Sequence, residues 1–240
     1  MKLSVLIPMY NEAETVLDMA KKMAETLDAA LGHGEYEVVF CDDGSRDGCR
    51  ELLDSHPVDG CRTVGYKDNR GKGSAIRYGI MQCEGDKIVY TDCDLAYGTQ
   101  AVVDIWNASG DNDVEIGCRT LGKDGYSGYT PLRKFMSKAY IKVISILAGF
   151  RYSDSQCGLK CLKREAARDI FSRCTVDGFA FDLEMLILAD KLGYRVGEFP
   201  AKIICNRDRG SKVSPIKDTV KMLKDVMKIK KIHKDVGKEK

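Results

Sequence analysis

The feature that most limits the fold is a regular alternation of short apolar runs with helix-like segments in the first half of the chain. The apolar runs predict buried strands at residues 2–8, 35–41, 61–66, 87–91 and 114–118, and the segments between them predict helices at 11–31, 71–83 and 99–109. Parallel strands need crossover connections of this kind. The alternation therefore predicts an α/β protein with a mostly parallel central sheet flanked by helices on both faces.

The second half of the chain alternates less regularly. It predicts helices at residues 131–150, 164–171, 181–192 and 215–233, a short strand at 158–162 and an extended segment at 195–204. In the last helix, apolar residues recur every three or four positions, as in an amphipathic helix. A chain of 240 residues can bury one good core. We expect one domain over residues 1–212 and a basic amphipathic helix and tail over residues 213–240.

The charge of the chain is concentrated in this tail. Residues 211–240 hold ten lysines and four acidic residues, a net charge of +6, so the total of +2 leaves −4 for residues 1–210. A basic amphipathic segment favours an anionic membrane surface as partner, and we expect no nucleic acid partner. No apolar run predicts a membrane-spanning helix or a signal peptide. The ten cysteines are scattered without a Cys-x-x-Cys pair, which favours a reduced, cytoplasmic protein.

Two carboxylates one residue apart close the fourth predicted strand. Asp92 and Asp94 follow the apolar run at residues 87–91. Mg²⁺ and Mn²⁺ prefer oxygen ligands and commonly share them with substrate phosphates. The motif therefore indicates a divalent metal site, and the alternative is a solvated acidic turn.

Other polar motifs follow predicted strands in the same way. They are Tyr10-Asn11-Glu12, Asp42-Asp43 and Arg119. Ligands of parallel sheets bind beyond the carboxyl ends of the strands. Tyr10 is placed to stack on a base, and Glu12 to accept from a ribose hydroxyl or a base. Asp43 is a candidate acceptor for a nucleobase edge. The alternatives are a strand end closed by Pro8 and ordinary helix caps.

Further candidates are glycine-rich, basic or acidic. Gly71 and Gly73 open a helix, and glycines at a helix N-terminus let anions approach the backbone, although the spacing is not that of a P-loop. Arginine forks match phosphate oxygens. The acids at residues 182 and 184 begin a helix, where they either serve the site or complement the helix dipole. The candidate phosphate contacts are Arg119, Arg133, Arg207, Arg209 and Lys212.

Taken in order, these motifs resemble the family 2 glycosyltransferases of the GT-A fold. Within that family the second half is most similar to the dolichyl-phosphate or polyprenyl-phosphate β-glucosyltransferases. The segments that carry the resemblance are residues 4–12, 42–47, 70–73 and 92–94 for the family, and residues 154–160, 178–184 and 210–215 for the branch.

The resemblance implies a nucleotide-sugar donor, a divalent metal (Mg²⁺ or Mn²⁺) and inverting transfer to a lipid phosphate. Asp94 is the implied main metal ligand, and Asp92 contacts the donor beside it. A Gln that completes the metal ligands in some mannosyl-transferring relatives corresponds here to Ala96. Diphosphate oxygens and water must then complete the coordination, and glucose from UDP-glucose is a better expectation than a mannosyl donor.

The site residues expected on this basis form three sets. The catalytic set is Asp92, Asp94, Arg119, Arg133, Asp182 and Glu184, and the metal ligands are Asp92 and Asp94. The substrate-binding set is Pro8, Tyr10, Glu12, Asp43, Lys72, Asp92, Asp154, Gln156, Arg207 and Lys212.

A polyprenyl phosphate is already anionic, so it needs no strong general base. Asp154, Asp182 and Glu184 are therefore assigned to positioning the sugar or the acceptor. If the acceptor were a glycan or glycolipid hydroxyl, one of these acids would have to be the base. Two further alternatives are a sugar-phosphate nucleotidyltransferase and a non-catalytic nucleotide-sugar sensor. We expect a peripheral enzyme at the cytoplasmic face of the membrane, and a homo-oligomer is left open.

Overall fold

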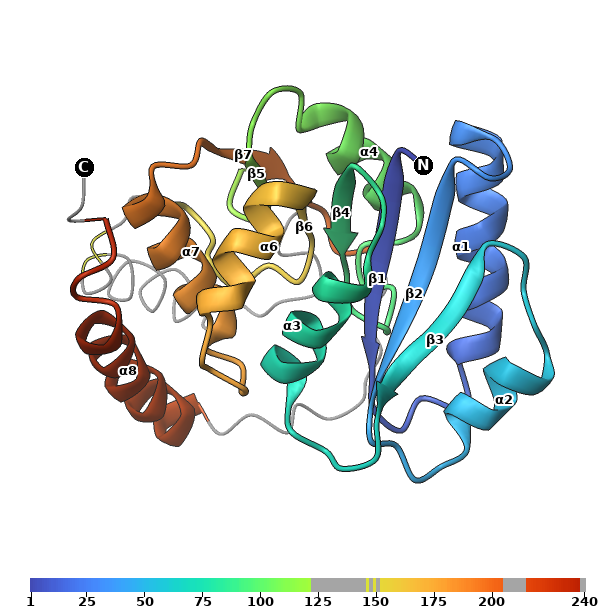
Figure 1. Cartoon of the computed structure of the whole chain (residues 1–240), viewed down its shortest axis with the longest axis horizontal. Coiled ribbons are helices and arrows are strands. Elements are labelled where there is room, and N and C mark those ends of the chain that lie inside the picture. Colours follow the sequence, from blue (N-terminus) through green and yellow to red (C-terminus); the bar gives the residue numbers. More distant parts are fainter. Residues whose placement is uncertain (122–145, 147–148, 150–151, 205–214, 238–240) are drawn as a thin grey trace.

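A seven-stranded, mostly parallel sheet forms the centre of the molecule (Figure 1). The computed structural model describes residues 1–121, 146, 149, 152–204 and 215–237, with only the backbone for 215–223. In sheet order the strands are β3 (Cys61–Tyr66), β2 (Tyr36–Asp43), β1 (Leu3–Met9), β4 (Lys87–Tyr90), β6 (Lys160–Lys163), β5 (Val114–Cys118) and β7 (Val196–Pro200). β6 is antiparallel to β4 and β5, and the other pairs are parallel. The predicted mostly parallel sheet is confirmed.

Helices cover both faces of the sheet (Figure 1). Residues of β1 alternate between the two faces, as they must in a strand. Val5 and Ile7 pack with Met19 of α1, whereas Leu6 packs with Ile76 of α3. One face carries α1 (Val16–Leu31), α2 (Cys49–Ser55) and α4 (Gln100–Ala108), and the other carries α3 (Lys72–Gln82), α6 (Arg164–Arg173) and α7 (Phe181–Leu192).

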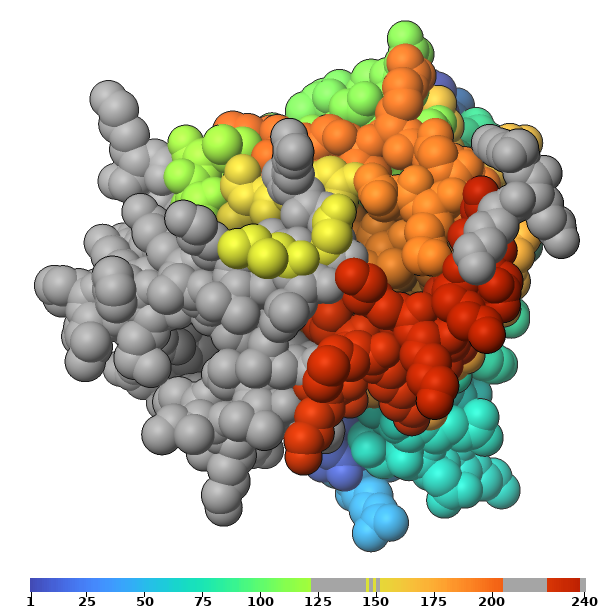
Figure 2. Space-filling view, turned by 90° about the vertical axis from the view of Figure 1, so that its left-hand side faces the viewer, coloured from blue at the N-terminus to red at the C-terminus, as the bar shows by residue number. Residues whose placement is uncertain are grey.

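The last helix, α8 (Pro215–Ile232), packs against α7 on the outside of the molecule. Figure 2 shows its surface next to that of the α7 region. Val226 and Ile229 are buried, while Met227 and the neighbouring lysines are exposed. α7 consequently lies between α6 and α8, and every residue from Phe181 to Ala189 is buried.

The element boundaries differ from the predictions at two places that matter for the site. The first helix begins at Val16 rather than at residue 11, because Asn11 has a positive φ of 56° and Glu12 starts a turn, accepting at its carbonyl from Thr15 N. The strand expected from residue 158 begins at Lys160. The helix expected at 131–150 lies outside the described residues except for 146 and 149, and the boundary at 212/213 stays a prediction.

Within the described part of the chain, no helix has both the length and the apolarity to cross a membrane.

Candidate functional site

The carboxyl ends of β1, β2 and β4 meet at one edge of the sheet and open into a cavity. These three strands are neighbours and parallel, so the residues that follow them come together. The cavity has a volume of about 470 Å³. Its lining includes Pro8, Tyr10, Glu12, Asp43, Lys72, Asp92 and Asp94 from the predicted set, together with Met9, Asn69, Gly71, Ala75, Cys93, Gly178 and Phe179.

Asp43 holds the loop between β3 and α3 against the end of β2. Its buried carboxylate accepts hydrogen bonds from Tyr66 Oη at 2.7 Å and Asn69 Nδ2 at 2.9 Å. The backbone N–H groups of Arg70 and Gly71 donate to the same carboxylate, each at 2.9 Å. Gly71 adopts a φ of +106°, and a Cβ there would lie 2.6 Å from the carbonyl oxygen of Asp177. Asp43 therefore shapes the glycine-rich entry to α3 while lining the cavity.

The turn after β1 presents an aromatic ring to solvent at the cavity. Tyr10 is 45% exposed, whereas its neighbour Asn11 is fixed in the adjoining loop. Asn11 N donates to Ser45 Oγ at 3.0 Å, and Arg46 N donates to Asn11 Oδ1 at 2.9 Å. The ring at residue 10 is thus available to a ligand at a backbone position that is itself held in place.

A cation and two carboxylates face one another at the end of β4. Lys72, in the first turn of α3, donates to Asp92 Oδ1 in an ion pair. Burial works to lower the pKa of Lys72, but the carboxylates of Asp92, Asp182 and Asp94 outweigh it and raise this pKa. Asp94 is exposed and accepts from Ala96 N at 3.0 Å.

Gly158 approaches Asp92 from the other side. A Cβ at this position would lie 2.1 Å from Asp92 Oδ2, so only glycine leaves the carboxylate in place. Gly158 N donates to Tyr97 Oη at 3.3 Å. Lys72 and Gly158 together determine where the Asp92 carboxylate points.

The donor set suits a hard divalent cation that is shared with a substrate. Asp92 and Asp94 supply carboxylate oxygens at the cavity, which are the ligands that Mg²⁺ and Mn²⁺ prefer. Among the described residues, no group of three His, Cys, Asp or Glu side chains is placed to hold a metal. A metal held by this pair would depend on oxygens from the bound substrate.

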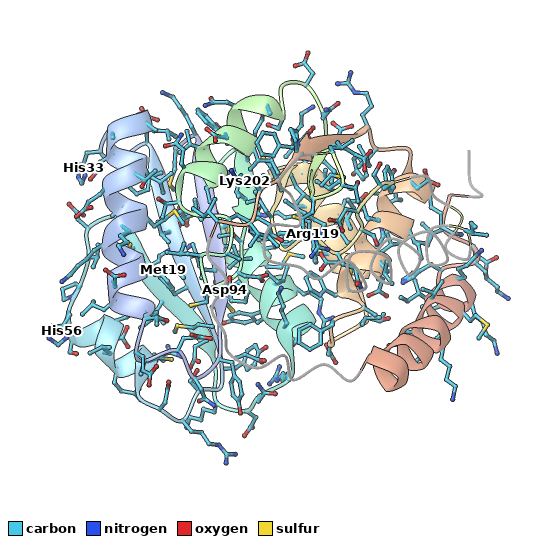
Figure 3. The ribbon with its side chains drawn as sticks, turned by 180° about the vertical axis from the view of Figure 1, so that it is seen from behind. Met19, His33, His56, Asp94, Arg119 and Lys202 are labelled. Atoms are coloured by element: carbon cyan, nitrogen blue, oxygen red, sulfur yellow. The ribbon has the colours of Figure 1, made fainter. Side chains whose placement is uncertain are left out.

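Arg119, Asp154 and Gln156 form a second polar cluster, behind the end of β5. Arg119 Nε and Nη2 lie 2.6 and 2.9 Å from the two oxygens of Asp154, and Gln156 N donates to Asp154 Oδ1 at 3.2 Å. Burial alone would raise the pKa of Asp154, but the Arg119 guanidinium holds it below its usual value. None of the three lines the cavity. Figure 3 shows Arg119 and Asp94 near the middle of the molecule, with His33 and His56 at the end formed by α1 and α2.

The two acids of α7 are enclosed. Asp182 Oδ1 accepts from Tyr90 Oη at 2.8 Å and from Lys160 Nζ at 2.7 Å, and Lys160 is completely buried. Glu184 is also completely buried and accepts from the Thr175–Val176 backbone. Neither acid lines the cavity. Arg133, Arg207, Arg209 and Lys212 lie outside the described residues.

Several residues that shape the cavity are absent from the predicted site residues, although three of them lie in the segments 154–160 and 178–184 that carry the resemblance. Asn69 and Phe179 line it, Gly158 approaches the Asp92 carboxylate, and Lys160 donates to the carbonyl oxygen of Cys157 at 2.6 Å. Phe179 is 71% exposed. Its place between two small residues just before a helix is the sequence pattern that could have indicated an exposed aromatic residue at the site. The close approach of Gly158 to Asp92 has no local signal, because the two residues are far apart in the sequence.

The sequence matches a known protein family. Residues 4–171 match the model of Glycosyl transferase family 2. The chain is 31% identical over 242 residues to a dolichyl-phosphate beta-glucosyltransferase of Dictyostelium discoideum, covering 95% of this chain and 73% of that protein. It is 30% identical over 251 residues to the human protein of the same name, covering 95% and 75%.

Solved structures share the fold. Glucosyl-3-phosphoglycerate synthase from Mycobacterium tuberculosis, in complex with Mn²⁺, UDP and glucosyl-3-phosphoglycerate, superposes with a TM-score of 0.65 at 17% identity, covering 98% of this chain and 80% of that one. Mannosyl-3-phosphoglycerate synthase from Rubrobacter xylanophilus gives a TM-score of 0.67 at 18% identity, covering 100% and 76%. Because the family model covers more than half of the sequence, the chain belongs to glycosyl transferase family 2, and its fold is the GT-A fold.

Proposed function

We propose that this glycosyltransferase moves glucose from UDP-glucose to a polyprenyl or dolichyl phosphate, with inversion, at a membrane surface. The observation that carries the proposal is the group formed by Lys72, Asp92 and Asp94 at the end of β4, inside a cavity that also holds Tyr10 and Asp43. The relatives named as dolichyl-phosphate beta-glucosyltransferases support the sugar and the acceptor.

The cavity offers a separate place for each part of such a donor. Tyr10 supplies an exposed ring on which a base can stack, and Glu12 lies beside it as an acceptor. Lys72 at the N-terminus of α3 suits the diphosphate, because both the ammonium and the start of a helix favour anions. A Mg²⁺ or Mn²⁺ held at Asp92 and Asp94 would neutralise charge on the departing nucleoside diphosphate.

The surroundings of the other acids support a phosphate acceptor. An acceptor hydroxyl needs a general base within hydrogen-bond reach of its proton. Asp154, Asp182 and Glu184 are buried, each already holds charged or N–H partners, and none lines the cavity. An anionic phosphate can attack the anomeric carbon without such a base.

The exposed face of α8 supports contact with an anionic membrane. Lys224, Lys228, Lys230 and Lys231 are exposed, and Met227 is 61% exposed beside them. Basic and apolar side chains on one outer surface favour the interface of anionic lipids. We place the enzyme at the cytoplasmic face, peripheral to the bilayer.

The function is tested with a panel of nucleotide sugars, a short-chain polyprenyl phosphate and Mn²⁺, with the product identified by mass. We expect a glucosyl polyprenyl phosphate from UDP-glucose, with release of UDP. Turnover on a hydroxyl acceptor without any lipid-phosphate product would contradict the proposal, and release of pyrophosphate from a nucleoside triphosphate would indicate a nucleotidyltransferase instead.

The membrane contact is tested by flotation with vesicles that contain anionic lipid. Replacing Lys228 and Lys231 by Glu should reduce the bound fraction, because each basic side chain near such a surface contributes about 1 kcal/mol. Unchanged binding by this variant would exclude the outer face of α8 as the contact.

A further inference from the structure

The C-terminal helix is joined to the core by a buried histidine. His233 directly follows α8 and is 4% exposed. Its Nε2 lies 2.7 Å from Glu184 Oε1 on α7. Lys191 Nζ donates to the carbonyl oxygen of His233 at 2.7 Å, which fixes the backbone of the same residue. The end of α8 is therefore held at a defined place on α7.

Glu184 also accepts hydrogen bonds from the turn that precedes α7. Its Oε2 accepts from Thr175 N at 2.9 Å and from Val176 N at 2.7 Å. Its Oε1 accepts from Thr175 Oγ1 at 2.8 Å as well as facing His233. A carboxylate only accepts hydrogen bonds, so Nε2 of His233 carries the proton in this contact. One buried carboxylate thus ties the helix end to the turn at Thr175–Val176.

The same turn packs on the first turn of α3. Asp177 O accepts from Gly73 N at 2.7 Å and from Ser74 N at 3.3 Å. A Cβ at Gly73 would lie 2.4 Å from Val176 O, so the two segments are in close backbone contact that only glycine allows. Arg77 Nη2 and Asp177 Oδ1, 2.6 Å apart, close the contact. A shift of the turn must move the start of α3.

Both partners of this packing border the donor cavity. Lys72 lies between Gly71 and Gly73 and pairs with Asp92, while Gly178 and Phe179 continue the turn along the cavity wall. A continuous set of contacts consequently runs from α8 through Glu184 to the ammonium group that faces Asp92.

We propose that His233 is a positioning residue: through Glu184 it holds residues 175–178 and the first turn of α3 in the arrangement that binds the donor diphosphate. Docking of the C-terminal helix then sets the affinity of the donor site. The link from helix to turn stands on the contacts alone, and only the effect on the donor rests on the proposed function.

The link from helix to turn is tested by hydrogen exchange on the full chain without ligand. His233→Ala should speed exchange of the amides in residues 71–74 and 174–178, and leave the amides of β1 and β2 as in the wild type. His33→Asn, at an exposed histidine on the far side of the molecule (Figure 3), is the matched control. His233→Gln should restore slow exchange, because its amide can donate in place of Nε2.

A second variant covers the case in which His233→Ala fails to fold. Thr175→Val removes one hydrogen bond to Glu184 at an exposed residue and leaves α8 untouched. It should speed exchange in the same two segments. Unchanged exchange in these two segments, in every one of the two variants that folds, would overturn the proposal.

The effect on the donor is measured by titrating UDP-glucose in the presence of Mn²⁺. His233→Ala should weaken binding about ten-fold, within the range by which mutations between two coupled sites act, and His233→Gln should recover most of the loss. A lower melting temperature with unchanged affinity would reduce His233 to a stabilising contact. If the wild type does not bind UDP-glucose, the proposed function fails, while the exchange result still decides the link.

Discussion

The carboxylates that follow β4 and those that begin α7 have the same chemistry and opposite surroundings. Asp92 and Asp94 line a cavity, and Asp94 is exposed to solvent. Asp182 and Glu184 are 5% and 0% exposed and hold internal partners. The edge of a parallel sheet leaves its strand-end residues facing a crevice, whereas an acid turned into a core must find donors there. An acid that ends a parallel strand is therefore a better sign of a site than one that begins a helix.

The largest expected effect is a loss of stability when the enclosed carboxylate of Asp182 is removed. Asp182→Asn leaves the buried ammonium of Lys160 without a carboxylate, which should lower the free energy of unfolding by about 3–5 kcal/mol. Urea denaturation measures this loss. The double variant Asp182→Asn with Lys160→Met removes both charges and should recover much of it. A fully stable Asp182→Asn protein without turnover would instead give Asp182 a direct part in the reaction.

On the other side of the comparison, Asp94→Asn should cost activity and little stability. The carboxylate is exposed, so the melting temperature should stay near that of the wild type. Loss of charge beside the departing diphosphate should lower kcat by roughly 10²- to 10³-fold, as removal of an electrostatic contact does in other active sites. Glu25→Gln, at an exposed acid on α1, serves as the control. Near-normal turnover of the Asp94 variant, with any donor and metal, would show that Asp94 has no part in the reaction.

The difference between the two groups also marks what the sequence can predict. The strands at Cys61–Tyr66 and Val114–Cys118 and the helix at Phe181–Leu192 are confirmed to the residue. Their apolar periodicity is local, and the polar residues that follow the strands share one edge because the strands are parallel neighbours. Local patterns were thus enough for the positions of these strands and for seven of the fourteen residues that line the cavity.

What lay beyond prediction depends on residues distant in the chain. The partners of Asp182 are Tyr90 and Lys160, and Glu184 faces His233, which follows α8. A strand such as β6 looks equally apolar whichever way it runs, so its antiparallel insertion between β4 and β5 has no local sign. Burial of a charged side chain is decided by these contacts and not by its neighbours in sequence.

A substitution at Gly158 tests whether activity depends on the exact position of the Asp92 carboxylate in the cavity. Alanine here would put a methyl carbon 2.1 Å from Asp92 Oδ2. The carboxylate has to leave its position beside Lys72, and we expect kcat to fall about ten-fold or more, since small misplacements of a reacting group are costly. Steady-state kinetics with UDP-glucose measures this. Unchanged kcat would mean that the position of Asp92 is not critical.

The smallest expected effect is a dependence of stability on pH that comes from Asp154, another enclosed acid. Pairing with Arg119 outweighs burial and lowers the pKa of Asp154 in the folded protein. The pair therefore contributes stability above the unfolded-state pKa of about 3.9, and this contribution is lost as the pH falls through the lower folded value. The gap in unfolding free energy between wild type and Asp154→Asn should be steady from about pH 5 to pH 7 and should narrow below about pH 4. Urea denaturation across this range measures the gap, and Asp111→Asn, at an exposed acid, should show no such narrowing. If the gap did not depend on pH, the charge of Asp154 would contribute nothing to stability. Asp154 would then not be an enclosed carboxylate that is stabilised by its charged partner, as Asp182 is.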